Sequence, residues 1–383
     1  MNITKITNFI YEKYVTVFNK NFLADFNPYK IKTKKKAILY YKYSQNFKNA
    51  KIGSTEYQCL GIAKAINKAG YLVTVVDRKV KFKITQKYEM FVGAFNTGGF
   101  VNFEHILKQL SKKTKIVGLS TGANPKQMRE QFIKREKMFK KRNKINLDHV
   151  SRFSNINFNK IKKKINYLIY FGYKKGFVDK SYTSFNNKFD IQPCISDKIK
   201  NERNKNKINL KNYIYYSGSG FLHKGLDLII EYFIKNQNLT LHICSPSYEA
   251  KFLNFYNISK YKNIIYHGNV KEDSNKAKEL FSKCGFIISM NCSGGGSASL
   301  AVGRRYGLIP VVWKNEDCNP KACYLISKEN FKEIDKVIKR LIKMNLHKYL
   351  RLSKENIKIS QENSSIYYQK RLIKIFRKIN AKK

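Results

Sequence analysis

Two glycine-rich turns hold the residue types and spacings that could do chemistry in this chain. Residues 217–227 read SGSGFLHKGLD, and residues 289–312 read SMNCSGGGSASLAVGRRYGLIPVV. Each turn follows an apolar run typical of a strand and opens into a run typical of a helix. Backbone N–H groups at a helix start point toward an anion, and a lysine beside them adds a point charge. The pattern predicts a site that grips the diphosphate of a nucleotide-linked substrate, provided that both turns face one cleft.

Lys224 is the expected phosphate contact, because it stands at the start of a predicted helix whose partial positive charge already attracts anions. The glycines around it let backbone amides approach a ligand without a Cβ clash. The candidate diphosphate-binding residues are Lys224, Gly218, Gly220, Gly294, Gly295, Gly296 and Ser297. The structural alternatives are a lysine on a solvated turn and a glycine run that is merely flexible.

A second set of residues is expected to line the same cleft, because open α/β sheets bind ligands beyond the carboxyl ends of their strands. The cleft candidates are Gly53, Ser54, Thr55, Thr121, Gly122, Ser219, His223, Ser299 and Glu316. Helix capping, local hydrogen bonding and a role as a loop acid are the alternatives for the serines, the histidine and the glutamate. No nucleophile–base set follows from spacing, so the catalytic residues stay unknown. The sparse, scattered histidines indicate no metal site.

The elements that must position these turns alternate along the chain. Short apolar runs predict strands at 36–41, 71–77, 88–95, 115–120, 167–172, 213–218, 239–244, 263–268, 286–291 and 309–313. Helices are predicted between them, including 225–236, 248–257, 274–283, 297–306 and 328–344. Such alternation implies α/β domains with parallel sheets covered on both faces.

A chain of 383 residues predicts two domains. We expect an amphipathic N-terminal helix segment at 1–36, a Rossmann-like domain at 37–194, a polar linker at 195–212, a second Rossmann-like domain at 213–345 and a helical tail at 346–383. The first segment is either a helix packed on the domain or an interfacial membrane helix. No apolar run reaches the ~18 residues of a membrane span. The start is unlike a signal peptide, and the seven cysteines show no regular spacing, so we expect a cytoplasmic protein with reduced thiols.

The formal net charge of +50 leaves three interpretations open. Nucleic-acid binding is the obvious one, but lysine outnumbers arginine about fivefold, whereas base and phosphate recognition favours arginine. Lysine, asparagine and isoleucine are also the residues that AT-rich codons supply, so the charge could be a solvated surface that reflects coding bias. Attraction to an anionic membrane surface is the third interpretation. We expect no specific nucleic-acid partner.

The second half of the sequence resembles the GT-B glycosyltransferases, in particular glycosyltransferase family 4. The resemblance rests on HKGLDLIIEYF (223–233), LTLHIC (239–244), NIIYHGNV (263–270), ELFSKCGFIIS (279–289) and GLIPVVW (307–313), and in layout alone on residues 54–77 of the first half. It implies two Rossmann-like domains facing an inter-domain cleft. It also implies a nucleotide-sugar donor on the second domain, a glycan or lipid-linked acceptor on the first, and transfer with retention of configuration without a metal ion or other cofactor.

The resemblance places Lys224 on the family's diphosphate-binding lysine. Ser219 stands where members often carry an arginine, and Gly294 and Val302 stand where the family has the two glutamates of its E-x7-E motif. The first glutamate normally meets the donor sugar and the second the ribose, so their absence leaves the donor and the activity open. We expect a sugar transferase for surface polysaccharide or glycoconjugate synthesis. The alternatives are a catalytically inactive GT-B binding subunit and, less favoured, a nucleic-acid-binding protein.

Lysines gather in two stretches of the first half, near 126–144 and 160–164. A basic surface of this kind would suit a lipid-linked acceptor at the anionic inner face of the cell membrane. A peripheral membrane location therefore accompanies the transferase hypothesis.

Overall fold

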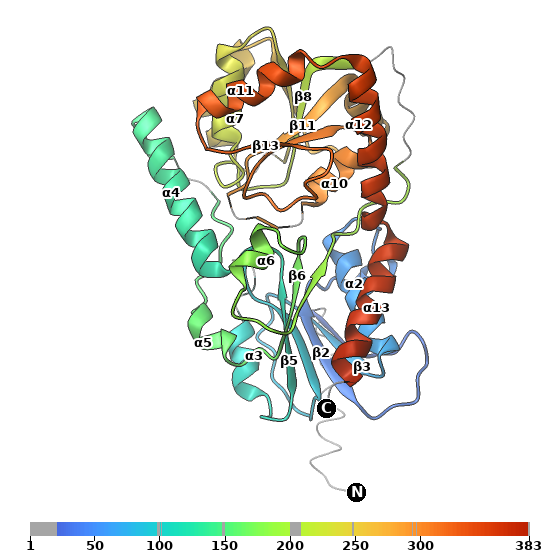
Figure 1. The fold of residues 1–383 in the computed structure, drawn as a ribbon. Helices are drawn as coiled ribbons and strands as arrows, with labels where there is room; N and C mark the ends of the chain where they lie inside the picture. Colours follow the sequence, from blue (N-terminus) through green and yellow to red (C-terminus); the bar gives the residue numbers. More distant parts are fainter. Residues whose placement is uncertain are drawn as a thin grey trace, which may run out of the picture.

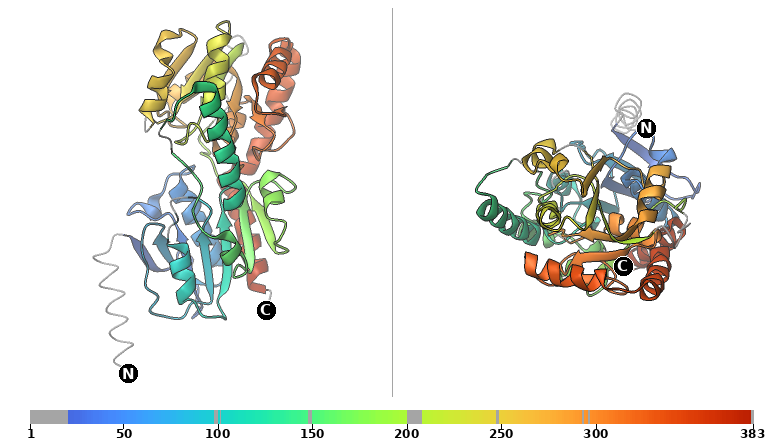
Figure 2. Two further views of the ribbon diagram at one scale, coloured as in Figure 1. Left: turned by 90° about the vertical axis from the view of Figure 1, so that its left-hand side faces the viewer. Right: turned by 90° about the horizontal axis from the view of Figure 1, so that it is seen from above.

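The computed structural model describes residues 21–97, 100, 102–147, 150–199, 208–246, 249–292, 294–295 and 297–381. Two α/β domains are stacked lengthwise, each built around one sheet (Figures 1 and 2). The first sheet has seven strands in the order β1-β3-β2-β4-β5-β6-β7, and the second has six in the order β10-β9-β8-β11-β12-β13. Every pair of neighbouring strands is parallel except β1 with β3. The α/β class expected from the alternation is confirmed.

The first domain holds the strands β1 (Phe22–Phe26), β2 (Lys36–Tyr41), β3 (Leu72–Asp77), β4 (Met90–Ala94), β5 (Lys115–Ser120), β6 (Tyr167–Phe171) and β7 (Lys188–Ile191). Its helices are α2 (Thr55–Lys68), α3 (Phe103–Gln109), α5 (Phe158–Lys162) and α6 (Phe177–Ser181). The central strands are buried on both faces, because helices cover both sides of a parallel sheet. Because both faces of these strands are buried, successive residues are apolar, which explains the apolar runs of the sequence.

The prediction of a helical segment over 1–36 is wrong for Phe22–Phe26, which form the antiparallel edge strand β1. Phe22 packs edge-on against Phe82, with ring centroids 5.3 Å apart, and Phe26 packs in the same way against Phe47. Pairing with the otherwise open edge of β3 outweighs the helical pattern here, since local propensity yields to tertiary contacts. Residues 1–20 lie outside the described part.

The second domain holds β8 (Asn209–Tyr216), β9 (Thr240–Cys244), β10 (Ile264–Gly268), β11 (Cys284–Ser289), β12 (Ile309–Trp313) and β13 (Tyr324–Ile326). Its helices are α7 (Leu226–Lys235), α8 (Ala250–Phe255), α9 (Asn275–Lys283), α10 (Ala298–Arg305) and α11 (Phe331–Ile342). All of the strands and helices predicted for this half are present, within a few residues. The region predicted as a linker at 195–212 ends inside β8, and residues 200–207 lie outside the described part.

The helical tail divides between the two domains (Figure 1). α12 (Leu346–Ile359) packs on the second domain, where the Tyr349 hydroxyl donates to the carbonyl oxygen of Gly285 at 3.1 Å. α13 (Ser365–Ala381) returns to the first domain and packs on α2, where the Tyr368 hydroxyl donates to the carbonyl oxygen of Gln58 at 3.1 Å. None of the described helices has the length and apolar character needed to cross a membrane.

One helix of the first domain is built onto the second domain. α4 (Pro125–Asn143) connects β5 to β6, yet it stands beside the second domain (Figure 1). Its buried Phe132 and Phe139 belong to the apolar core of that domain. Arg142, near its end, forms ion pairs with Asp227 and Glu231 of α7. The segments that lead into and out of α4 are thereby held at the boundary between the domains.

Candidate functional site

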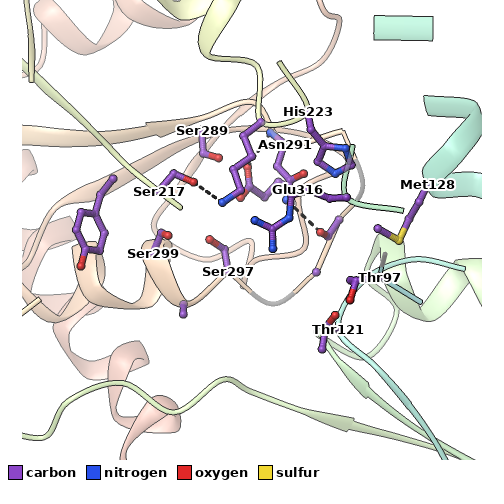
Figure 3. Close-up of a pocket in the computed structure, with 16 residues that line it drawn as sticks. Thr97, Thr121, Met128, Ser217, His223, Ser289, Asn291, Ser297, Ser299 and Glu316 are labelled. Atoms are coloured by element: carbon purple, nitrogen blue, oxygen red, sulfur yellow. Dashed lines mark hydrogen bonds between the residues drawn. The ribbon is translucent and has the colours of Figure 1, made fainter. Parts of the chain in front are cut away.

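A pocket of about 230 Å³ lies between the two domains, where the carboxyl ends of strands from both sheets meet (Figure 3). Its lining from the first-domain part of the chain is Thr97, Thr121, Met128 and Arg152, and its lining from the second domain is Tyr216, Ser217, His223, Lys224, Ser289, Asn291, Gly294, Gly295, Ser297, Ala298, Ser299 and Glu316. Hydroxyls, two cations and one carboxylate face this space. The cavity therefore has the chemistry to receive a polar anionic ligand.

The two glycine-rich turns lie side by side at the pocket, as the diphosphate hypothesis requires. The N–H of Met290 donates to the carbonyl oxygen of Lys224 at 3.3 Å, and the N–H of Cys292 donates to that of His223 at 3.1 Å. His223 is buried, and its ring lies 5.4 Å from that of Phe132 on α4. Both turns thus form one wall, which α4 supports from behind.

Lys224 presents its amine to the pocket. Nζ donates to Ser217 Oγ at 2.6 Å, a bond drawn as a dashed line at Ser217 in Figure 3. The carbonyl oxygen of Gly218 lies 3.5 Å from Nζ. Burial, and then repulsion from Arg152, hold the pKa of Lys224 well below its usual range, although Glu316 and Glu249 act in the opposite direction. An anion bound here would favour the charged form of the amine.

Arg152 is a pocket residue that sequence reasoning missed. It lies between α4 and α5, and its Nη1 donates to the carbonyl oxygen of Ser219 at 2.9 Å. Burial lowers the pKa of its guanidinium. Nothing in its local sequence marks it, because it reaches the pocket only through the path of the chain around α4. Ser219 itself, a cleft candidate, contributes a backbone carbonyl to this contact and is not part of the pocket wall.

Glu316 supplies the carboxylate of the pocket. It follows β12, its side chain is buried, and one oxygen accepts the N–H of Asn291 at 3.3 Å. Burial raises the pKa of Glu316, while the Ser289 hydroxyl, the Asn291 amide and the Lys224 amine lower it. Val302, the position expected to carry the second motif glutamate, lies on α10, and its side chain is buried in the apolar core. Glu316 is thus the carboxylate that the described residues bring to this space.

The second glycine turn leads into α10, whose first residues line the pocket. Ser297 caps the helix by accepting the N–H of Leu300 at 3.3 Å, and Ser299 lies in the first turn (Figure 3). A Cβ added to Gly294 would lie 2.6 Å from Phe177, and one added to Gly295 would lie 2.7 Å from the carbonyl oxygen of Thr121. These glycines let the first domain approach closely, a role that the ligand hypothesis did not foresee. Gly296 lies outside the described residues.

The first glycine turn does not offer its amides to a ligand as predicted. The N–H groups of Gly220 and Phe221 donate to one oxygen of Glu249, at 2.6 and 3.0 Å, and Val150 donates to the other at 3.1 Å. A carboxylate of the chain itself therefore fills the expected anion cradle, and this corrects the assignment of Gly220. Gly218 also lies outside the pocket wall, although its carbonyl oxygen faces Lys224.

The first-domain candidates separate in space. Thr121 lines the pocket, whereas Gly122 does not, and its carbonyl oxygen accepts the hydroxyl of Ser120 at 2.6 Å. The turn at Gly53, Ser54 and Thr55 is not part of the lining of this pocket. Ser54 caps α2 by accepting the N–H of Tyr57 at 3.0 Å. A Cβ added to Gly53 would meet Glu272 of the second domain, because this turn packs at a different contact between the domains.

Acidic, histidine and cysteine side chains are the groups that could hold a metal ion. In the described part of the chain, no three of them cluster in a way that could hold a metal ion.

No family model matches the sequence, and no curated protein matches it. Among solved structures, sucrose-phosphate synthase from Thermosynechococcus elongatus is similar with a TM-score of 0.58 at 8% identity, over 91% of this chain and 100% of that chain. WaaG, described as a glycosyltransferase involved in lipopolysaccharide biosynthesis, gives 0.50 at 10% identity over the same shares. TarM gives 0.51 at 15% identity over 75% of this chain, which spans 54% of the length of TarM. These likenesses show the fold, and the chain has the GT-B architecture that the resemblance implied.

Proposed function

We propose that the protein is a glycosyltransferase that moves a sugar from a nucleotide-sugar donor to a glycan or lipid-linked acceptor. The observation that carries this proposal is the pocket of the GT-B cleft, where Lys224 and the start of α10 face one space. A cation beside a helix N-terminus suits a diphosphate. The first-domain wall, with Thr97 and Thr121, would receive the acceptor.

In the proposed reaction, the bond between the anomeric carbon of the sugar and the diphosphate oxygen breaks, and a bond to the acceptor oxygen forms. The leaving diphosphate gains negative charge. Lys224 and the start of α10 stabilise that charge, and because they are already oriented toward it, they need not rearrange during the reaction. The acceptor hydroxyl gives its proton to a phosphate oxygen of the departing diphosphate. Glu316 would accept a hydrogen bond from a hydroxyl of the donor sugar. We propose retention of configuration and independence of a metal ion, as the resemblance to family 4 implies.

The basic face of α4 supports the proposed place of the reaction. Its exposed lysines are Lys126, Lys134, Lys137, Lys140, Lys141 and Lys144. Such a face would attract anionic lipids at the inner side of the cell membrane, where lipid-linked acceptors for surface polysaccharide are presented. Co-sedimentation of the protein with phosphatidylglycerol vesicles tests this point. The bound fraction should fall with added salt and should be smaller with phosphatidylcholine vesicles, which are the control.

The first experiment is a thermal-shift screen against UDP-, GDP-, ADP- and CMP-sugars without added metal. Stabilisation by one of them in the wild type, lost in Lys224→Ala and kept in Lys271→Ala, would support the donor site. Lys271 is the matched control, because it is an exposed lysine outside the pocket. No shift with any donor would count against the proposal. Binding without hydrolysis or transfer would instead favour a catalytically inactive binding subunit.

A further inference from the structure

We propose that Arg152 is the second cation of the diphosphate site, so that the donor is gripped from both sides of the cleft. This inference rests on the function proposed for the pocket. It adds a residue from the segment between α4 and α5 to a site otherwise built by the second domain.

The geometry of Arg152 is that of a positioned ligand-binding arginine. Its bond to the Ser219 carbonyl uses one N–H of the guanidinium and fixes the plane of the group. A Cβ added to Gly220 would lie 2.8 Å from Arg152 Cδ, so the glycine gives room for the side chain to lie across the first turn. A guanidinium has five N–H donors in a rigid fork that matches phosphate oxygens. The pocket-facing edge can therefore bind two oxygens at once.

The charges around the pocket favour an anion between Arg152 and Lys224. Each cation is partly removed from water. Burial and then Arg152 lower the pKa of Lys224, and burial together with Arg78 lowers the pKa of Arg152. The nearby carboxylates offset this only in part, because Glu249 is engaged by three backbone N–H groups and Glu316 by one. A diphosphate would relieve the repulsion between the cations and neutralise both.

Arg152 also depends on the first domain for its place. The next two residues are tied to that domain: Phe153 forms a bridge with Thr97, and the Ser154 hydroxyl donates to the carbonyl oxygen of Phe95 at 2.9 Å. Lys224 belongs to the second domain. A diphosphate that contacts both side chains thus links the domains, and its binding favours the arrangement in which Arg152 reaches the pocket.

Calorimetric titration with inorganic pyrophosphate tests the inference, with orthophosphate as the single-phosphate comparison. Arg152→Gln and Arg152→Met should each weaken pyrophosphate binding about tenfold or more, and should affect orthophosphate less, because one phosphate cannot span both cations. Arg152→Lys should recover part of the loss. Arg129→Gln is the matched control, because it removes an exposed arginine of α4 that lies outside the pocket.

The outcomes separate the two proposals. If the wild type binds neither pyrophosphate nor any nucleotide-sugar, the donor site and the role of Arg152 both fail. If binding is lost in Lys224→Ala and unchanged in both neutral Arg152 variants, the role of Arg152 alone is overturned. Melting curves without ligand check that each variant is folded. If one neutral variant does not fold, the other decides, and Arg152→Lys decides if neither does, since an unaltered affinity for both anions would contradict a fork-like contact.

Discussion

Arg135 of α4 and Glu329 of the second domain form a buried ion pair, although α4 connects two strands of the first sheet. Arg135 also donates to the carbonyl oxygens of Met290, at 2.8 Å, and Leu222, at 3.3 Å. It thus braces both glycine-rich turns from behind. The same side chain that joins the domains therefore supports the pocket.

Removing one partner of this pair should be costly. Arg135→Leu leaves the Glu329 carboxylate buried without its partner, and we expect the free energy of unfolding to fall by about 3–5 kcal/mol. Arg135→Leu combined with Glu329→Leu should lose less than the single change. Urea unfolding of the three proteins measures both effects. Equal stability of Arg135→Leu and the wild type would show that the pair contributes nothing.

Diphosphate binding should be accompanied by proton uptake. The pKa of Lys224 is held low mainly by burial and by Arg152, and a bound diphosphate raises it again. Affinity for pyrophosphate should accordingly weaken as the pH rises through the lowered pKa. Titrations in Tris and HEPES, which differ in ionisation enthalpy, should give different apparent binding enthalpies. The difference should be smaller in Lys224→Met and in Arg152→Gln than in the wild type. An unchanged difference in Lys224→Met would contradict the prediction.

Glu272 should contribute less to the stability of the fold as the pH rises. One of its oxygens accepts the N–H of Ser196 at 2.6 Å, and burial is the main cause that raises its pKa to about 7. Because the folded state holds this proton more tightly than the unfolded state, the contribution is full at low pH and is lost as the pH rises through about 7. Glu272→Gln keeps the acceptor and removes the titration. Its unfolding free energy should exceed that of the wild type by about 1 kcal/mol at pH 8 and match it near pH 4.5.

Gly295 should resist substitution more than another glycine with a positive φ. Gly295→Ala places a Cβ against the Thr121 carbonyl at a φ of +106°, whereas Gly268, with a φ of +68°, has open space around it. We expect Gly268→Ala to cost about 1 kcal/mol from backbone strain alone, and Gly295→Ala to cost at least twice that. Urea unfolding compares them. Small-angle scattering should show a larger radius of gyration for Gly295→Ala alone, and an unchanged radius would mean that the domains tolerate the added Cβ.

The sequence predicted the sheets well because burial on both faces leaves a strong local trace, as in KAILYY at 36–41 and IPVVW at 309–313. The edge strands β1, β7 and β13 were not predicted, because they are short and less uniformly apolar. Lys224, Ser297 and Glu316 could be placed near the pocket because each directly follows or belongs to a strand-to-helix turn or strand end.

The rest of the site depends on contacts between distant parts of the chain. Arg152 reaches the pocket because α4 packs on the second domain although it connects two strands of the first sheet. No local sequence pattern predicts that packing. Glu249, which is 28 or more residues further along the chain, accepts hydrogen bonds from the N–H groups of Gly220 and Phe221. The turn at Gly53 was assigned by analogy between the two halves, but it packs against Glu272 of the second domain and does not line the pocket.

α4 of the first domain packs on the second domain, and α13, which follows the second domain, packs on the first. This arrangement affects how the protein folds during synthesis. The first domain is synthesised before the second, yet α13, which packs on its α2, emerges only after the whole second domain. The contact between Tyr368 and Gln58 spans 310 residues, so the first domain stays incomplete on the ribosome while its neighbour forms. Such long-range closure slows folding. It also makes the two halves one cooperative unit, and a fragment cut between them would expose Phe132, Phe139 and the charge of Arg135 without their partners.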